Sequence, residues 1–259
     1  MNFKRIEILF IFVFFFLDIF LFFNYQQTVN VQSNSEKETT VTDAINEMRK
    51  DNISVPKVSS TRKQKGYLLS YSHTGANNNE KDSAATNLLQ KKVTLKTPIT
   101  ISKKNPVEDL KKFIENNSEI NHAQDYVYSK DLSSDKHFVF VQKFQKNLFY
   151  DLNGQLSFDL KGNVISDYLI SHIDSLSESK EFETIMSEEE AIVKLYTLNE
   201  IPNNTRILWR QLAYSWMLEA NNVSVYVPTW YIALQNKRTK NITIEKINAF
   251  TGALWKASF

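Results

Sequence analysis

The sequence contains no cysteine and only five glycines among its 259 residues. Without cysteine the chain forms no disulfide, offers no thiolate to a metal ion, and has neither a cysteine nucleophile nor a cysteine that could carry a lipid. The scarcity of glycine argues against the glycine-rich loops that hold phosphate groups in nucleotide-binding proteins. These absences exclude thiol chemistry and lipoprotein anchoring, and they disfavour nucleotide binding.

The chain also lacks an excess of one charge, because 31 Lys and Arg stand against 29 Asp and Glu. No long run of one sign occurs, so the dense basic surface that binds a phosphate backbone is missing. We therefore expect no nucleic-acid partner. The hydrophobic content of 42% is enough for one large domain or two small ones with real cores.

One apolar run, residues 8–23, lies near the N-terminus. With its flanks it covers residues 6–25, about 30 Å of helix at about 1.5 Å per residue, which is one membrane crossing. Lys4 and Arg5 precede the run and no Lys or Arg follows until Lys37. The positive-inside rule therefore predicts cytoplasmic residues 1–5, a transmembrane helix at 6–25 and an extracytoplasmic remainder. A cleaved signal peptide is the alternative, but no small-x-small cleavage site follows the run.

This segment contains the carboxylate of Asp18, which costs about 2.5–3.5 kcal/mol in a helix interior on insertion scales. Snorkelling toward the outer end of the run, about 7.5 Å away, is one way to lower that cost. Helical geometry also places Asp18 on one stripe with the other acid of the segment. The stripe consists of Glu7, Ile11, Phe14, Asp18, Phe22 and Tyr25. We predict that this transmembrane stripe is a partner interface, because a neighbouring helix could satisfy the carboxylate.

Residues 26–104 are predicted to be a polar tether with intermittent structure. Helical spacing indicates a short helix near residues 42–50, and residues 66–72 and 92–101 read as short strands that would add edges to the folded part.

Two helix starts divide the rest of the chain into predicted units at 105–180 and 181–259. Asn105 is a candidate N-cap followed by proline at the first helical position, and Ser187 with Glu190 forms a candidate capping box. The apolar stripes of the two helices are predicted to be Val107, Leu110, Phe113 and Ile114 in the first, and Ile192, Leu195, Tyr196 and Leu198 in the second.

Strand patterns follow each helix start. They lie at residues 125–128, 137–144, 155–160 and 164–173 in the first unit, and at 206–218, 223–227, 230–235 and 242–247 in the second. We therefore predict an α+β fold of two similar units, each a helix packed on an antiparallel sheet, with the duplication inferred from element order.

No catalytic constellation is apparent. The histidines, His73, His122, His137 and His172, are scattered, and none has a metal-type partner at i+4. His172 and Asp174 share a face, but two ligands of unequal strength make a poor metal site, so we interpret them as a solvated strand end. The acidic residues at 178–190 are interpreted as helix capping and solvation. We predict no metal, no cofactor and no enzymatic activity.

Several segments together resemble the YycI (WalI) family. These are the N-terminal MNFKRIEILFIFVFFFLDIFLF, the strand FVFVQKF followed by DLNGQLSFDLKGNVI, the helix SEEEAIVKLY before an IP turn, and VPTWYIAL leading to INAFTGAL. Members are single-pass, externally displayed accessory proteins of the WalK/WalR (YycG/YycF) two-component system of Gram-positive bacteria. The last segments also look like the closing hairpin of PepSY-type domains, which are non-catalytic.

The resemblance implies a regulator without an active site. It would contact the sensor histidine kinase WalK, which controls cell-wall hydrolase genes, and work with the related protein YycH, with the transmembrane helix implicated in the contact. The alternative is an extracytoplasmic binding module that captures an envelope ligand. An envelope hydrolase is a weaker third hypothesis, since no nucleophile, metal cluster or acid pair can be assembled from the sequence.

Overall fold

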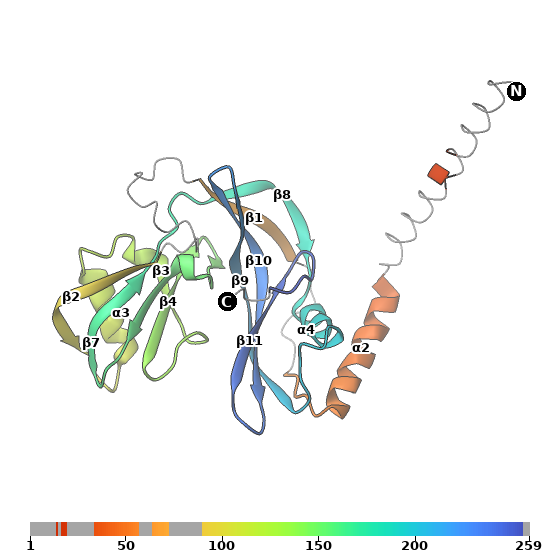
Figure 1. Ribbon diagram of the computed structural model, residues 1–259, viewed down its shortest axis with the longest axis horizontal. Coiled ribbons are helices and arrows are strands. Elements are labelled where there is room, and N and C mark those ends of the chain that lie inside the picture. Colours follow the sequence, from red (N-terminus) through yellow and green to blue (C-terminus); the bar gives the residue numbers. More distant parts are fainter. Residues whose placement is uncertain (1–13, 15–16, 20–33, 57–63, 73–89, 256–259) are drawn as a thin grey trace, which may run out of the picture.

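The computed structural model describes residues 14, 17–19, 34–56, 64–72 and 90–255. Two antiparallel sheets dominate this part of the chain, and a few helices pack against them (Figure 1). The fold is therefore α+β and rich in sheet, as the sequence predicts.

The first sheet, called the α3 sheet here, is covered by helix α3 (Pro106–Asn116). Leu110 and Ile114 of α3 are buried against an aromatic sheet face that includes Phe140, Phe158 and Tyr168. In spatial order its strands are β2 (Lys91–Thr100), β7 (Val164–Ile170), β6 (Gln155–Asp159), β4 (His137–Phe144) and β3 (Tyr126–Ser129), with β5 (Asn147–Leu148) paired to β4.

The second sheet, called the α4 sheet here, is covered by helix α4 (Glu188–Thr197). Ile192 and Leu195 of α4 are buried in one cluster with Trp230 and Ile232 of the sheet. The longer helix α2 (Asn34–Lys50) packs on α4 (Figure 1). The strands are β11 (Ile242–Asn248), β10 (Val223–Asn236), β1 (Gln64–Ser72) and β8 (Ser177–Ile185) in that order, with β9 (Thr205–Ala220) paired to β10.

The helix starts lie where the sequence predicts them, but only one has the predicted cap. At α4 the Glu190 amide donates to Ser187 Oγ at 3.2 Å and the Ser187 amide donates to Glu190 Oε2 at 2.9 Å, so the capping box is confirmed. The Asn105 side chain makes no capping hydrogen bond at α3. Leu198 was wrongly placed in the buried stripe, because α4 ends at Thr197 and the Leu198 side chain is exposed.

Strand β10 corrects the prediction of two separate strands at 223–227 and 230–235. Pro228 does not interrupt it, because one edge of β10 pairs with β9 without a register shift from Tyr226 to Ala233. On the other edge, β1 pairs with β10 only up to Tyr226, and β11 begins at Thr229. The missing N–H of Pro228 falls in the gap between these two partners, so no ladder hydrogen bond is lost.

Strand β8 was also missed, since residues 178–190 were attributed to capping and solvation. Most side chains of β8 are exposed on both faces, so the strand shows none of the apolar alternation that marks a half-buried strand. It is held instead by pairing with β1, from Gln64 opposite Ile185 to Ser70 opposite Ser177. As a result β1 lies inside the α4 sheet rather than at its edge, whereas β2 is an edge strand as predicted.

The two sheets pack on each other through aromatic side chains, a contact called the inter-sheet joint here. Phe149 and Tyr150 follow β5 of the α3 sheet and are 0% and 5% exposed. Phe149 stacks on Tyr214 of β9 with ring centroids 5.6 Å apart, and Tyr150 meets Tyr231 of β10 edge-on at 5.2 Å. Aromatic pairs of this kind contribute about 0.5–1.5 kcal/mol beyond the area they bury.

The packing around Gly66 tests the interior position of β1. A Cβ at this residue would lie 2.5 Å from Ile185 Cγ2 and 2.9 Å from Phe250 Cε1. We expect Gly66→Ala to lower the free energy of unfolding by about 1–3 kcal/mol, because the neighbours must move apart. Gln64→Ala, at an exposed position of the same strand, should change it by less than about 0.5 kcal/mol. Urea denaturation of the purified chain measures both, and equal stability of the two variants would contradict this packing.

Candidate functional site

The chain crosses from the α3 sheet to the α4 sheet through residues 171–176, between β7 and β8. Ile173, in the middle of this linker, is 1% exposed and packs beside Phe149 and Tyr214 of the inter-sheet joint. His172 and Asp174 flank Ile173 in sequence. The buried isoleucine therefore fixes where these two polar side chains emerge.

Gln142 of β4 holds the linker backbone. Its Nε2 donates to the Ile173 carbonyl at 2.7 Å, and its Oε1 accepts from the Ile173 amide at 2.9 Å. The side chain is 3% exposed. This pair of hydrogen bonds satisfies both backbone polar groups of a buried residue and explains a glutamine on a face otherwise lined by phenylalanines.

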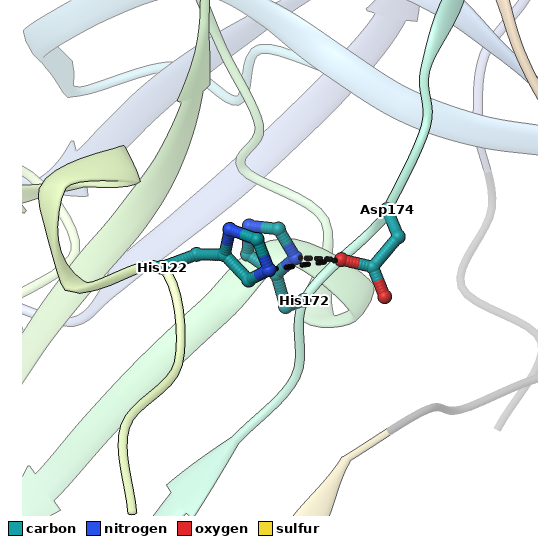
Figure 2. A group of neighbouring side chains, drawn as sticks. All are labelled: His122, His172 and Asp174. Carbon is teal, nitrogen blue, oxygen red and sulfur yellow. Dashed lines mark hydrogen bonds and ion pairs between the residues drawn. The ribbon is translucent and has the colours of Figure 1, made fainter. Parts of the chain in front are cut away.

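His122 and Asp125 approach the linker from a short turn, η2 (Ala123–Asp125). His122 precedes the turn with φ of 57°, in the left-handed region, and the Asp125 amide donates to the His122 carbonyl at 2.9 Å. The turn brings the side chains of His122 and Asp125, which are three positions apart in the sequence, to the side that faces the linker. There the His122 ring stacks on the His172 ring, with centroids 4.5 Å apart and planes within 9° (Figure 2).

Both imidazoles lie between the same two carboxylates. Asp174 Oδ1 is 2.8 Å from His172 Nδ1 and 3.7 Å from His122 Nε2, on the side drawn in Figure 2. Asp125 Oδ2 is 3.0 Å from His172 Nε2 and 3.8 Å from His122 Nδ1. The His172 side chain is 15% exposed and the His122 side chain 51%. The group can therefore take up positive charge, either as protons on the imidazoles or as a cation between the donor atoms.

Tyr126 lies on the interior side of the cluster formed by His122, His172, Asp125 and Asp174. Its hydroxyl donates to the Ser171 carbonyl at 2.5 Å, and its ring meets the His172 ring edge-on at 5.8 Å. Burial raises the pKa of the Tyr126 hydroxyl above its usual value, and the nearby charges of Asp125 and Asp174 raise it further. Tyr126 therefore stays protonated and keeps donating to the start of the linker.

The interpretation of His172 and Asp174 as a solvated strand end is wrong for His172, which is largely covered. It overlooked His122 and Asp125, because proximity created by folding does not appear as a sequence spacing. One signal for this pair was available in the sequence. His122 and Asp125 are three positions apart, and a tight turn brings side chains at that spacing close together. Among the described histidines, His137 lies elsewhere and pairs with Asp159 at 2.7 Å; His73 lies outside the described residues.

The predicted transmembrane stripe is described in part. Phe14 and Asp18 are helical and exposed, whereas Glu7, Ile11, Phe22 and Tyr25 lie outside the described residues. In the described portion of the chain, no helix is long and apolar enough to cross a membrane. The predicted span at 6–25 falls mostly outside that portion.

The two hydrogen bonds from the Gln142 side chain to the Ile173 backbone, called the Gln142 clamp here, can be tested by replacing Gln142. We expect Gln142→Leu to lower the free energy of unfolding, by about 1–3 kcal/mol for each Ile173 backbone group left buried without a partner. Lys143→Ala, at the exposed neighbouring position of β4, should stay within about 0.5 kcal/mol of the parent chain. Urea denaturation measures the difference. Unchanged stability of Gln142→Leu would show that the clamp contributes nothing.

The comparison with protein families agrees with the resemblance seen in the sequence. Residues 31–250 match the family described as YycI protein. No protein with a curated description matches the chain. The solved structures to which the chain shows some similarity include an uncharacterized protein from Eubacterium rectale, with 11% identity, a TM-score of 0.40, and 88% of this chain and 83% of that chain covered. Another is the C-terminal domain of YpeB from Bacillus megaterium, with 16% identity, a TM-score of 0.39, and 63% of this chain and 67% of that chain covered. Since the family match spans most of its length, the chain belongs to the YycI family.

Proposed function

We propose that this chain is a non-catalytic, membrane-anchored regulator that modulates a WalK-like sensor histidine kinase controlling cell-wall metabolism. It acts with a YycH-like accessory protein, through its transmembrane helix and its external domain. The observation that carries this proposal is membership of the YycI family across residues 31–250. In this arrangement residues 6–25 cross the membrane, and the units at 105–180 and 181–259 lie outside the cell. The segment predicted as a polar tether, residues 26–104, contributes α2, β1 and β2 to the folded part rather than a simple spacer.

Contacts at and just after the C-terminal end of α2 support a connection between the anchor and the external domain. Met48 is fully buried in the core under α4, and the Tyr196 hydroxyl of α4 donates to Asp51 Oδ2 at 2.7 Å. Ser54 then bonds to the start of β9, its amide donating to the Thr205 carbonyl at 2.9 Å. The chain between the predicted anchor and the α4 sheet is therefore fastened to the sheet close to the C-terminal end of α2. A displacement of the membrane helix could reach the sheet through this short connection.

The alternative, an extracytoplasmic module that captures an envelope ligand, has one structural observation in its favour. An open hollow of about 770 Å³ lies between α3, η2 and β3. Lys111, Glu115 and Gln124 are the lining residues with long polar side chains. A hollow of this size with few convergent polar groups is typical of small-molecule sites, although such sites are usually more enclosed.

The proposed partners can be tested by co-purification. When the full-length chain is extracted from membranes of its own cells with a mild detergent, we expect the histidine kinase and the YycH-like protein to be recovered with it. An unrelated single-pass protein carrying the same affinity tag serves as the control. Recovery of neither partner would count against the regulatory proposal and favour the ligand-capturing module.

The transmembrane stripe can be tested separately with Asp18→Leu. We expect the helix still to insert, because the change removes a polar group that is costly in lipid. Association with the kinase or the YycH-like protein should weaken by about 1–2 kcal/mol, or roughly 5- to 30-fold, the range of a polar contact between membrane helices. A bacterial two-hybrid assay, with membrane fractionation to confirm insertion, measures the change.

Phe20→Leu is the matched control, since it lies about 200° around the helix from Asp18. It should leave association unchanged. If Asp18→Leu behaves like Phe20→Leu, the carboxylate snorkels to the membrane surface and the stripe is not the interface.

A further inference from the structure

We propose that His122, His172 and Asp174 form a binding site for a divalent transition-metal ion of the zinc class. The site lies at the junction of the two sheets, is independent of the membrane helix, and is not required by the regulatory role proposed above. No ion is needed to assemble the three side chains, because the joint, the Gln142 clamp and the η2 turn already bring them together.

The donor atoms suit zinc. Two imidazole nitrogens and one carboxylate oxygen are a common ligand set for Zn²⁺, whereas Mg²⁺ and Ca²⁺ prefer oxygen throughout. One ligand atom from each residue lies within 4.8 Å of the other two. Ligands at about 2.0–2.1 Å in a tetrahedral site lie about 3.3 Å from one another. Asp174 Oδ1 is 2.8 Å from His172 Nδ1 and 3.7 Å from His122 Nε2, so both distances from the carboxylate oxygen are within about half an ångström of that spacing.

Asp125 supplies the outer support that a zinc-binding histidine normally has. Its Oδ2 is 3.0 Å from His172 Nε2, so that nitrogen can donate its proton to the carboxylate. In the tautomer with the proton on Nε2, Nδ1 carries the lone pair and is the nitrogen that faces Asp174. The Gln142 Nε2 atom, 3.2 Å from His172 Nε2, is a second neighbour of the nitrogen that faces Asp125. Asp125 thereby orients the His172 ring before a metal arrives.

His122 is the ligand that has to move. A bound ion lies in the plane of each imidazole that ligates it, whereas the His122 and His172 rings are stacked within 9° of parallel. The His122 side chain is 51% exposed, so its ring can turn toward the ion without disturbing a core. In the metal-free protein the two imidazole rings are therefore stacked, and metal binding would turn the His122 ring out of the stack.

The charge of the cluster also favours a dication. Within the described chain, the ion pairs of Asp125 and Asp174 are all made with these two histidines. With both imidazoles neutral, the four side chains carry a net charge of −2, which a divalent ion balances. Protons compete for the same nitrogens, so metal affinity should fall as the pH is lowered.

Three protein ligands leave a fourth position for water or for a group from another molecule. Because Asp174 belongs to the linker and His122 to a turn of the α3 sheet, the ion would tie the linker to that sheet. Metal occupancy would thus restrict motion at the crossing between the two sheets.

Metal binding can be measured on the chelator-treated, untagged full-length chain in detergent micelles. Titration calorimetry with ZnCl₂ should show one saturable site per chain. Co²⁺ should give the visible absorption of a four-coordinate ion with nitrogen and oxygen ligands. His122→Ala and Asp174→Asn should each abolish the absorption, and Asp125→Asn should weaken zinc affinity by about 10- to 100-fold.

His137→Ala is the matched control, because it removes a histidine from a similar exposed His–Asp pair that lacks a second imidazole. It should leave stoichiometry and affinity unchanged. The proposal is overturned if the parent chain shows no saturable binding, or if His122→Ala binds zinc as tightly as the parent. Neither result would bear on recovery of the kinase, so the two proposals can fail separately.

Discussion

The contact between the two sheets is the constraint from which the other features of this protein follow. Phe149 and Tyr150 sit against the tyrosines of β9 and β10 with almost no exposed surface. Ile173 enters the same core and draws the linker with it. If this contact were absent, the linker would have no fixed path, and His172 and Asp174 would have no fixed place beside His122. The aromatic packing therefore builds the polar cluster.

Two connections hold the described parts of the chain together. At one, residues 48–54 join α2 to α4 and β9, which connects the N-terminal segment to the α4 sheet. At the other, the linker connects the α4 sheet to the α3 sheet beside the histidine–aspartate cluster. The proposed regulation of a membrane-bound kinase would need such a continuous path of packed elements. Coupling along this path is a hypothesis, because it requires two states of the joint that differ in free energy.

The local elements were largely predictable because their signals are carried by neighbouring residues. The capping box at Ser187, the hairpin around Gly162 and strand β4 all depend on side chains within a few positions of one another. Predictions failed where partners are distant. Pro228 looked like a strand boundary, because a proline fits inside β10 only where β1 has ended and β11 has not yet begun. β8 looked like a solvated segment because its main support is backbone pairing with β1, a strand more than 100 positions away.

The sequence by itself determined the α+β class, the order of most helices and strands, and the segments that identify the YycI family, since propensity, periodicity and capping act over short distances. Only the tertiary structure decided that β1 lies inside the α4 sheet and that His122 stacks on His172, 50 positions away along the chain. The physical reason is that distant partners set these placements: β1 pairs with β10 and β8, and burial of the inter-sheet aromatics brings the linker with His172 to the turn that follows His122. Burial is a property of the whole packed chain, and no pattern of adjacent residues encodes it.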